Sequence, residues 1–166
     1  MAEVAEPYRI IFVCTGNIFR SLTADVALRK LLAGDPGFHV SSAGTDDYPH
    51  VVRPYTGAYL LSKGFDVASH RRRTLTSAIL AECRLVVSMS TDHQALLRER
   101  FGRETPLFLE ACGLEPEWLP DIEDVVPDYR TNRQAVEAHV RSTIDRILEL
   151  APRMAQNLAA LAKKYP

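Results

Sequence analysis

The sequence predicts an α/β protein, a three-layer α/β/α sandwich with a four-stranded parallel sheet. Two observations lead to this prediction. Short apolar segments rich in β-branched and aromatic residues, typical of buried strands, occur at residues 9–13, 38–43, 84–89 and 105–109. Segments with helical periodicity separate them, and this alternation is typical of parallel strands joined by right-handed crossovers. Because ligands bind such folds beyond the carboxyl ends of the strands, we expect a site there.

The helical segments have their own start and stop signals. Thr74 is a suitable N-cap for one of them, and Thr91 or Asp92 for the next, because these side chains accept hydrogen bonds from the first backbone N–H groups. Pro152 removes a backbone donor inside the last helical segment, so an interruption is allowed there. We expect helices at residues 22–33, 55–63, 74–81, 91–101 and 133–161.

Residues 110–132 predict a long irregular segment, because three prolines interrupt it. Loops of this length in a compact domain are usually functional or disordered. The chain of 166 residues is expected to form one domain, 1–166, with a loose tail at residues 1–7.

The composition excludes several classes of protein. Apolar residues make up 46% and charged residues 25% of the chain, which is ordinary for a soluble protein. The net charge of −1 argues against general binding to nucleic acid or a membrane surface. Cys14, Cys83 and Cys112 lack the spacing of a disulfide framework or a zinc site. We therefore expect a cytoplasmic monomer or weak dimer that uses no metal or cofactor and does not enter a membrane.

A Cys-x5-Arg segment links the first predicted strand to the first predicted helix. A Gly-Asn pair inside it tolerates the positive φ of a sharp turn. The backbone N–H groups of residues 15–20 can point at an anion, with the positive end of the helix dipole behind them. The same field favours the nucleophilic thiolate of Cys14, and the planar guanidinium of Arg20 can bind two phosphate oxygens. The segment 14–21, called the phosphate loop below, is thus predicted to bind phosphate.

The phosphate loop resembles the Cys-x-Gly-Asn-x-Cys-Arg-Ser signature of the low-molecular-weight protein tyrosine phosphatases, and here it is Cys14-Thr15-Gly16-Asn17-Ile18-Phe19-Arg20-Ser21. The resemblance covers residues 8–150. It includes an acidic loop before the last helix and two further segments of the family, Ser41-Ser42-Ala43-Gly44-Thr45 and Ser69-His70-Arg71-Arg72-Arg73.

This resemblance implies hydrolysis of phosphotyrosine in proteins, with a phosphocysteine intermediate and inorganic phosphate as product. Cys14 would attack phosphorus, while Arg20 and the loop amides stabilise charge on the equatorial oxygens. Ser21 would hydrogen-bond the sulfur and help it leave. The phosphate-binding residues are then Thr15, Gly16, Asn17, Ile18, Phe19, Arg20 and Ser21.

The resemblance also implies residues that support the phosphate loop. Asn17 would hold its strained backbone, with Ser42 and His70 behind it. Residues 71–73, three arginines, are most simply a solvated turn, although one of them could anchor the loop or attract anionic substrates.

The general acid that protonates the leaving group has two candidates, because the Asp-Pro pair usual in the family is missing. Asp124 follows Asp-Ile-Glu, which matches the residues before the family's acid, and Asp128 lies in Val-Pro-Asp-Tyr-Arg, which matches the residues after it. We favour Asp124, because the extra residues can form a bulge after it. Asp121 and Glu123 are expected to be solvent-facing loop charges.

The substrate cleft implied by the resemblance is aromatic and apolar. Ile18 suits an aromatic phosphoester, and Tyr48 and Tyr129 fall where the family places rings along the cleft wall. Phosphoarginine is a rival substrate, but phosphatases of that type carry a small polar residue where Ile18 stands. Phe19 replaces a second cysteine that can protect the nucleophile as a disulfide, so Cys14 is expected to oxidise further.

Two functions of other classes remain open. A thioredoxin-coupled arsenate reductase shares this fold and loop, but it needs two further cysteines close together, whereas Cys83 and Cys112 lie far apart in the sequence. A non-catalytic phosphate-binding module would also retain the loop, and only the missing Asp-Pro pair favours it.

Overall fold

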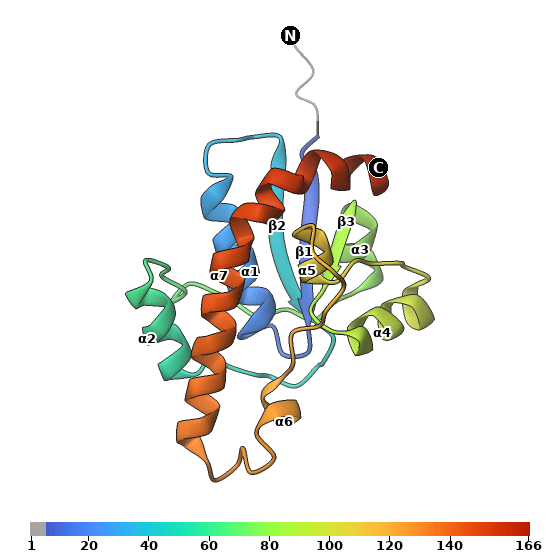
Figure 1. Ribbon diagram of the computed structural model, residues 1–166. Helices are drawn as coiled ribbons and strands as arrows, with labels where there is room; N and C mark the ends of the chain where they lie inside the picture. Colours follow the sequence, from blue (N-terminus) through green and yellow to red (C-terminus); the bar gives the residue numbers. More distant parts are fainter. Residues whose placement is uncertain (1–5) are drawn as a thin grey trace.

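The computed structural model describes residues 6–166, so residues 1–5 of the predicted tail lie outside the described part. Its sheet has the strand order β2-β1-β3 and is parallel throughout (Figure 1). The central strand β1 (Tyr8–Cys14) pairs with β2 (Phe38–Gly44) on one side and with β3 (Leu85–Ser88) on the other. Because Cys14 lies opposite Gly44 and Val13 opposite Ser88, the carboxyl ends of the three strands meet at one edge.

The predicted fourth strand at residues 105–109 is wrong, because the described chain forms only three strands. Leu107 makes a single bridge to Ser88, and the helix α5 (Phe108–Ala111) begins directly after it. Pro106 has no N–H to extend a ladder, and the N–H of Leu107 donates instead to the Glu110 carboxylate at 3.3 Å. Local capping therefore turns this apolar segment into a helix.

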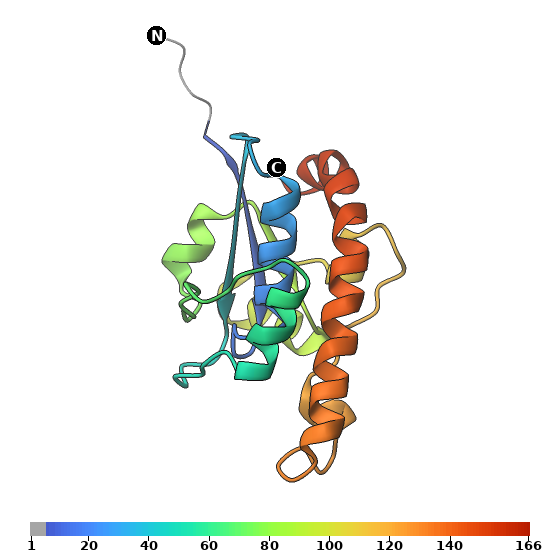
Figure 2. The same ribbon diagram turned by 90° about the vertical axis from the view of Figure 1, so that its left-hand side faces the viewer.

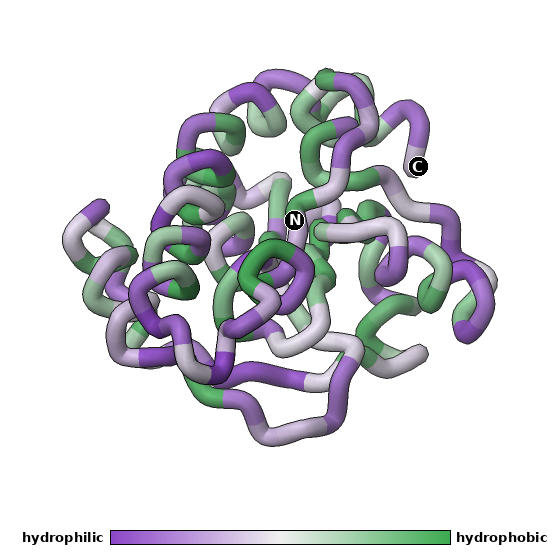
Figure 3. The backbone as a smooth tube through the Cα atoms, turned by 60° about the horizontal axis from the view of Figure 1, so that its bottom comes forward, coloured by the Kyte–Doolittle hydropathy of each residue, from purple (hydrophilic) through white to green (hydrophobic). Residues whose placement is uncertain are grey.

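Helices cover both faces of the sheet, as the three-layer prediction requires (Figures 1 and 2). Ile10, Phe12 and Cys14 of β1 pack toward α1 (Arg20–Leu31) and α7 (Arg133–Lys164). Ile11 and Val13 face the other way, toward α3 (Ser77–Glu82) and α4 (Thr91–Phe101). This alternation is the period of two expected for a strand buried on both faces. In Figure 3, hydrophilic residues make up much of the outer turns and loops, and hydrophobic residues alternate with them along the helices.

A third apolar cluster joins the phosphate loop to the helices beside it. Phe19 and Leu22, at the start of α1, pack with Leu60 of α2 (Pro54–Ser62) and with Val136 and Val140 of α7. The first turn of α1 is thus held by packing in addition to the backbone hydrogen bonds of the helix.

The longest helix, α7, runs without a break through Pro152, where an interruption had been allowed. Pro152 removes one backbone donor, but Leu150, Ala151 and Met154 around it are buried, and their packing holds the helix together. In Figure 1 the end of α7 runs at an angle to the rest of the helix. Across residues 6–166, no helix combines the length and apolar character that crossing a lipid bilayer requires.

The helix caps differ from those predicted. Helix α3 begins at Ser77 with Thr76 as its cap, whereas Thr74 forms a bridge to Gly44. Helix α4 begins at Thr91 as predicted, but its cap is Ser90, the residue before the two that were considered. The irregular segment 110–132 contains α5 and a second short helix, α6 (Ile122–Val125).

Gly44, the last residue of β2, lies very close to the phosphate loop. A Cβ atom at this position would lie 2.5 Å from the carbonyl oxygen of Thr15 and 3.2 Å from the backbone nitrogen of Asn17. Gly44→Ala should therefore destabilise the protein by about 1–3 kcal/mol, because backbone rather than a flexible side chain must move. The midpoint of urea unfolding measures this change.

Gly57 is the matched control for that substitution. In α2 its added Cβ would meet no atom closer than 3.9 Å. Gly57→Ala should leave stability unchanged or raise it by roughly 0.5–1 kcal/mol, since alanine loses less backbone entropy in a helix. Equal midpoints for Gly44→Ala and the wild type would contradict the close approach.

Candidate active site

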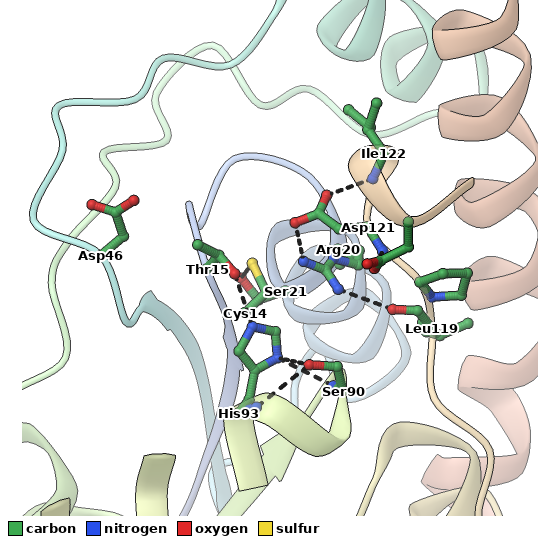
Figure 4. Close-up of polar contacts among 12 residues, drawn as sticks. Cys14, Thr15, Arg20, Ser21, Asp46, Ser90, His93, Leu119, Asp121 and Ile122 are labelled. Atoms are coloured by element: carbon green, nitrogen blue, oxygen red, sulfur yellow. Dashed lines mark hydrogen bonds and ion pairs between the residues drawn. The ribbon is translucent and has the colours of Figure 1, made fainter. Parts of the chain in front are cut away.

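A cavity of about 1100 Å³ opens at the carboxyl edge of the sheet. The phosphate loop forms its floor, and the remaining walls come from the loop after β2, the start of α4, residues 121–124 and the start of α7 (Figure 4). This is the position predicted from the alternation of strands and helices.

Cys14 lies at the bottom of the cavity with only 3% of its surface exposed. The backbone N–H of Asn17 donates to its sulfur at 3.3 Å, and the Ser21 hydroxyl lies 2.9 Å from the same sulfur. The sulfur is thus held between a backbone N–H and a hydroxyl at the bottom of the cavity. The phosphate loop ends where α1 begins at Arg20, so the positive end of the helix dipole faces the cavity.

Asn17 holds the phosphate loop through contacts at both ends of its side chain. Its φ is +56°, the single left-handed value among the non-glycine residues of the described chain. Its side-chain amide donates to Ser21 at 3.0 Å and accepts from the N–H of Arg73 at 3.2 Å, and its own carbonyl lies 2.8 Å from the His70 ring. These bonds hold Asn17 in a backbone conformation that few residues adopt.

Ser42 reaches the phosphate loop only indirectly. Its hydroxyl donates to the buried carboxylate of Asp25 at 2.8 Å, and its carbonyl accepts from the Arg73 guanidinium at 3.0 Å. Of the two predicted supports, His70 therefore touches Asn17 directly, whereas Ser42 acts through Arg73.

The arginine segment 71–73 is more than a solvated turn. Arg72 donates to the carbonyl of Gly16 at 3.0 Å and also to the carbonyl of Asp46. Arg72 thus joins the phosphate loop to the loop after β2, and Arg73 supports Asn17. The alternative that one arginine of this segment anchors the loop fits Arg72 and Arg73, whereas Arg71 bonds only to carbonyls of its own segment.

Arg20 is buried, with 3% exposure, and two groups from residues 119–121 hold its guanidinium. It donates to the carbonyl of Leu119 at 2.9 Å and to the carboxylate of Asp121 at 2.5 Å (Figure 4). The expectation that Asp121 is a solvent-facing loop charge is therefore wrong. Asp121 also accepts the N–H of Ile122 at 2.8 Å, so it caps α6 and lines the cavity.

The two acids chosen from the sequence bond to other parts of the described chain than the phosphate loop. The carboxylate of Asp124 accepts the backbone N–H of Asp121 at 2.7 Å, so it serves as a capping group at the cavity wall. Asp128 accepts from the Asn132 side chain at 3.0 Å, just before α7, and does not line the cavity. The signal for Asp121 was an aspartate after a proline and directly before a short helix, which is a typical N-cap.

His93 is a buried residue of the site that the sequence analysis did not identify. The backbone N–H of Ser90 donates to its Nδ1 at 3.1 Å, so the proton lies on Nε2, which is 3.0 Å from the Thr15 hydroxyl (Figure 4). Burial, and then the charge of Arg20, lower the pKa of His93 to about 3. The ring is therefore neutral at physiological pH and donates to the phosphate loop.

The residues predicted for the walls of the substrate cleft divide into two groups. Ile18 and Tyr129 line the cavity. Tyr48 does not; it is 65% exposed, and its ring lies against His50, with 4.9 Å between the centroids. Phe19 is buried at the N-cap position of α1, where it makes no side-chain capping bond, and its ring centroid lies 6.3 Å from that of His139.

The other two cysteines lie in different parts of the core. Cys112 belongs to the apolar cluster on the α1 and α7 face of the sheet, and Cys83 to the cluster on the α3 and α4 face. Burial raises the pKa of Cys112 to about 12 and also raises that of Cys83. Their positions do not suit a thiol relay to Cys14.

Comparison with known proteins agrees with this geometry. The family model described as low molecular weight phosphotyrosine protein phosphatase matches residues 9–165. The chain is 32% identical over 142 residues to the low molecular weight protein-tyrosine-phosphatase Etp of Escherichia coli (strain K12), covering 82% of this chain and 87% of that protein. It is also 34% identical over 148 residues to a protein-arginine-phosphatase of Geobacillus stearothermophilus, covering 86% and 95%.

A solved structure has the same fold. The tyrosine phosphatase Wzb from Escherichia coli K30, in complex with sulphate, superposes with a TM-score of 0.71 at 26% identity, covering 91% of this chain and 98% of that one. The chain therefore belongs to the low molecular weight phosphotyrosine protein phosphatase family, as the resemblance of its loop indicated. It is a hydrolase of the low-molecular-weight phosphatase type.

The neutral state of His93 predicts a specific sensitivity to acid. The folded pKa lies below the ordinary value of 6.5, so the unfolded chain binds more protons between pH 6.5 and about pH 3. His93 should therefore reduce stability as the pH falls through this window, by up to about 1.4 kcal/mol per pH unit. Urea unfolding of the wild type and His93→Gln at pH 7 and pH 4.5 measures the difference.

His39→Gln is the control, because His39 is exposed on β2. It should lose as much stability on acidification as the wild type, whereas His93→Gln should lose less. An identical acid dependence in all three proteins would show that His93 is not held neutral.

Proposed function

We propose that this protein is a cysteine-dependent phosphatase that hydrolyses phosphotyrosine in proteins through a phosphocysteine intermediate. One observation carries the proposal: the sulfur of Cys14 lies at the bottom of the cavity, between the Asn17 N–H and the Ser21 hydroxyl, at the end of the loop that leads to Arg20. The site joins a nucleophile, an anion-binding backbone and a guanidinium.

The first chemical step follows from these contacts. The Cys14 thiolate attacks phosphorus, and the bond to the phenolic oxygen of the substrate breaks. The loop amides and Arg20 hold the three equatorial oxygens of the phosphoryl group in place and stabilise the negative charge that they carry. Ser21, at 2.9 Å from the sulfur, then stabilises the thiolate as it leaves when water attacks the phosphocysteine.

We assign the general acid to Asp121 in place of Asp124. Asp121 is the carboxylate that reaches the Arg20 guanidinium and lines the cavity, whereas Asp124 caps the same turn and Asp128 lies outside the cavity. A phosphate group bound by Arg20 competes with Asp121 for the guanidinium. The released carboxylate takes up the proton of the phosphate monoanion, passes it to the leaving oxygen as the ester bond breaks, and as a carboxylate again accepts a proton from the attacking water.

Phosphotyrosine is favoured over phosphoarginine by the apolar wall of the cavity. Ile18 and Tyr129 present apolar and aromatic surface to an aromatic ester. Relatives of this chain include proteins named for each activity, so the substrate class is decided by experiment. Turnover of a phosphotyrosine peptide should exceed that of a phosphoarginine peptide of the same sequence, and the reverse ratio would assign the arginine class.

The other two classes fit the site less well. An arsenate reductase needs a thiol relay, and Cys83 and Cys112 lie on opposite faces of the sheet. A binding module needs no acid beside the arginine, yet Asp121 lies 2.5 Å from Arg20.

Cys14→Ser tests the nucleophile. We expect it to reduce the turnover of p-nitrophenyl phosphate by more than about a thousandfold, because an alcohol replaces the thiolate. Cys112→Ser is the control, since Cys112 is buried away from the cavity; its variant should keep most of its activity per folded molecule. Comparable activity in Cys14→Ser and the wild type would exclude the proposed reaction.

The acid assignment is tested with three variants, Asp121→Asn, Asp124→Asn and Asp128→Asn. Asparagine retains capping ability, so α6 should persist in each. With a poor leaving group such as phenyl phosphate, Asp121→Asn should reduce kcat by about 10²–10⁴-fold, and with p-nitrophenyl phosphate by much less. The other two variants should show no such dependence, and finding it in Asp124→Asn instead would restore that residue as the acid.

A further inference from the structure

A second cavity lies directly beside the first. It has a volume of about 580 Å³ and lies between residues 50–61, which include most of α2, and residues 66–72. Ile18, His50, Arg53 and Pro54 line both cavities, so the second one, called the side groove below, is continuous with the active-site cavity. A protein substrate whose phosphate is bound at Cys14 could therefore place neighbouring residues of its chain in the side groove.

The floor of the side groove is apolar. Val52, Pro54 and Val67 contribute to it, and Val51 and Leu61 at its edges are 66% and 60% exposed. Exposed aliphatic side chains around a cavity are typical of a surface that receives another chain.

The rim of the side groove is strongly basic. Arg53, Arg71 and Arg72 lie along it, and Asp66 is its sole acidic residue. In the part of the chain that the structure describes, none of these three guanidinium groups forms an ion pair with a carboxylate. Arg71 donates only to the carbonyls of Ala68 and His70, at 3.2 and 3.0 Å, and it remains exposed.

The active-site cavity carries charges of both signs, because Arg20, Arg53, Arg130 and Arg133 line it together with five acidic residues. Asp46, Asp92, Asp121, Glu123 and Asp124 line it. The side groove, with three arginines against one aspartate, is therefore the more positive of the two cavities. An acidic group next to the phosphorylated residue would complement it.

We propose that the side groove binds the segment of the substrate protein adjacent to the phosphotyrosine, with an apolar side chain on the floor and an acidic side chain against Arg53 and Arg71. This inference rests on the proposed function, and it goes further because it defines the flanking sequence that the enzyme selects. The wall formed by Ile18 separates the phosphotyrosine ring from the flanking residues, since this side chain lines both cavities.

Binding to the Cys14→Ser protein tests the groove without requiring turnover. Three phosphotyrosine peptides are compared by calorimetry: one with Glu and Leu beside the phosphotyrosine, one with Lys and Leu, and one with Glu and Ser. We expect the first to bind about three- to tenfold more tightly than either of the others at low salt. The advantage of Glu over Lys should shrink at high salt, because the rim charges are exposed.

Arg71→Glu in the same background should remove or reverse the preference for the acidic flank. Arg100→Glu is the matched control, because Arg100 is an exposed arginine of α4 that lines neither cavity. In the protein with Cys14 intact, Arg71→Glu should leave the turnover of p-nitrophenyl phosphate unchanged, since this small substrate does not extend into the side groove.

The outcomes separate the two proposals. Equal affinity for the three peptides, or an equal effect of Arg71→Glu and Arg100→Glu, would contradict binding of the flanking residues in the side groove. Neither result would contradict the proposed phosphatase reaction. Absence of binding by any phosphotyrosine peptide, together with absence of phosphotyrosine turnover, would overturn the proposed function and the side groove with it.

Discussion

The site depends on a single residue in the left-handed region of backbone space. Asn17 turns the chain at φ +56°, and its position brings its own N–H to the sulfur of Cys14. Asparagine tolerates this region better than other non-glycine residues. Its side chain bonds Ser21 within the same loop, whereas its contacts with His70 and Arg73 come from one segment that lies 53 and 56 positions later in the sequence. The phosphate loop is therefore shaped by the folded sheet, and the isolated segment would not hold it.

Charge in the cavity is arranged around one buried cation. Arg20 has 3% exposure, and Leu119 and Asp121 satisfy it from a segment about a hundred residues later in the sequence. An ion pair of this kind has a partner that can be exchanged, because a phosphate dianion offers the guanidinium two oxygens in place of one. In the proposed reaction, binding of the substrate phosphate to Arg20 thus also releases the Asp121 carboxylate from this guanidinium.

Several elements set by residues close in sequence were predicted, although the caps of α3 and α4 were not, and two contacts that only the fold creates were missed. The strand β1, the phosphate loop and the start of α4 follow from local pattern, because burial and turn chemistry act within a few residues. The pattern of segment 105–109 predicted a strand. Pro106 lacks an N–H for a strand ladder and Glu110 caps α5, so the segment leads into a helix instead. His93 and Asp121 were missed because their roles depend on Thr15 and Arg20, which lie far from them in sequence.

The short helix α6 has a consequence for how the enzyme would lose its function. It spans only four residues, none of them buried, and Asp121 is its N-cap. Cys14, by contrast, lies in the central strand with 3% exposure. Segments with little buried surface open at lower free energy than a core strand does. On mild heating, the proton donation proposed for Asp121 would therefore fail while Cys14 and the sheet remain in place, so inactivation would precede global melting.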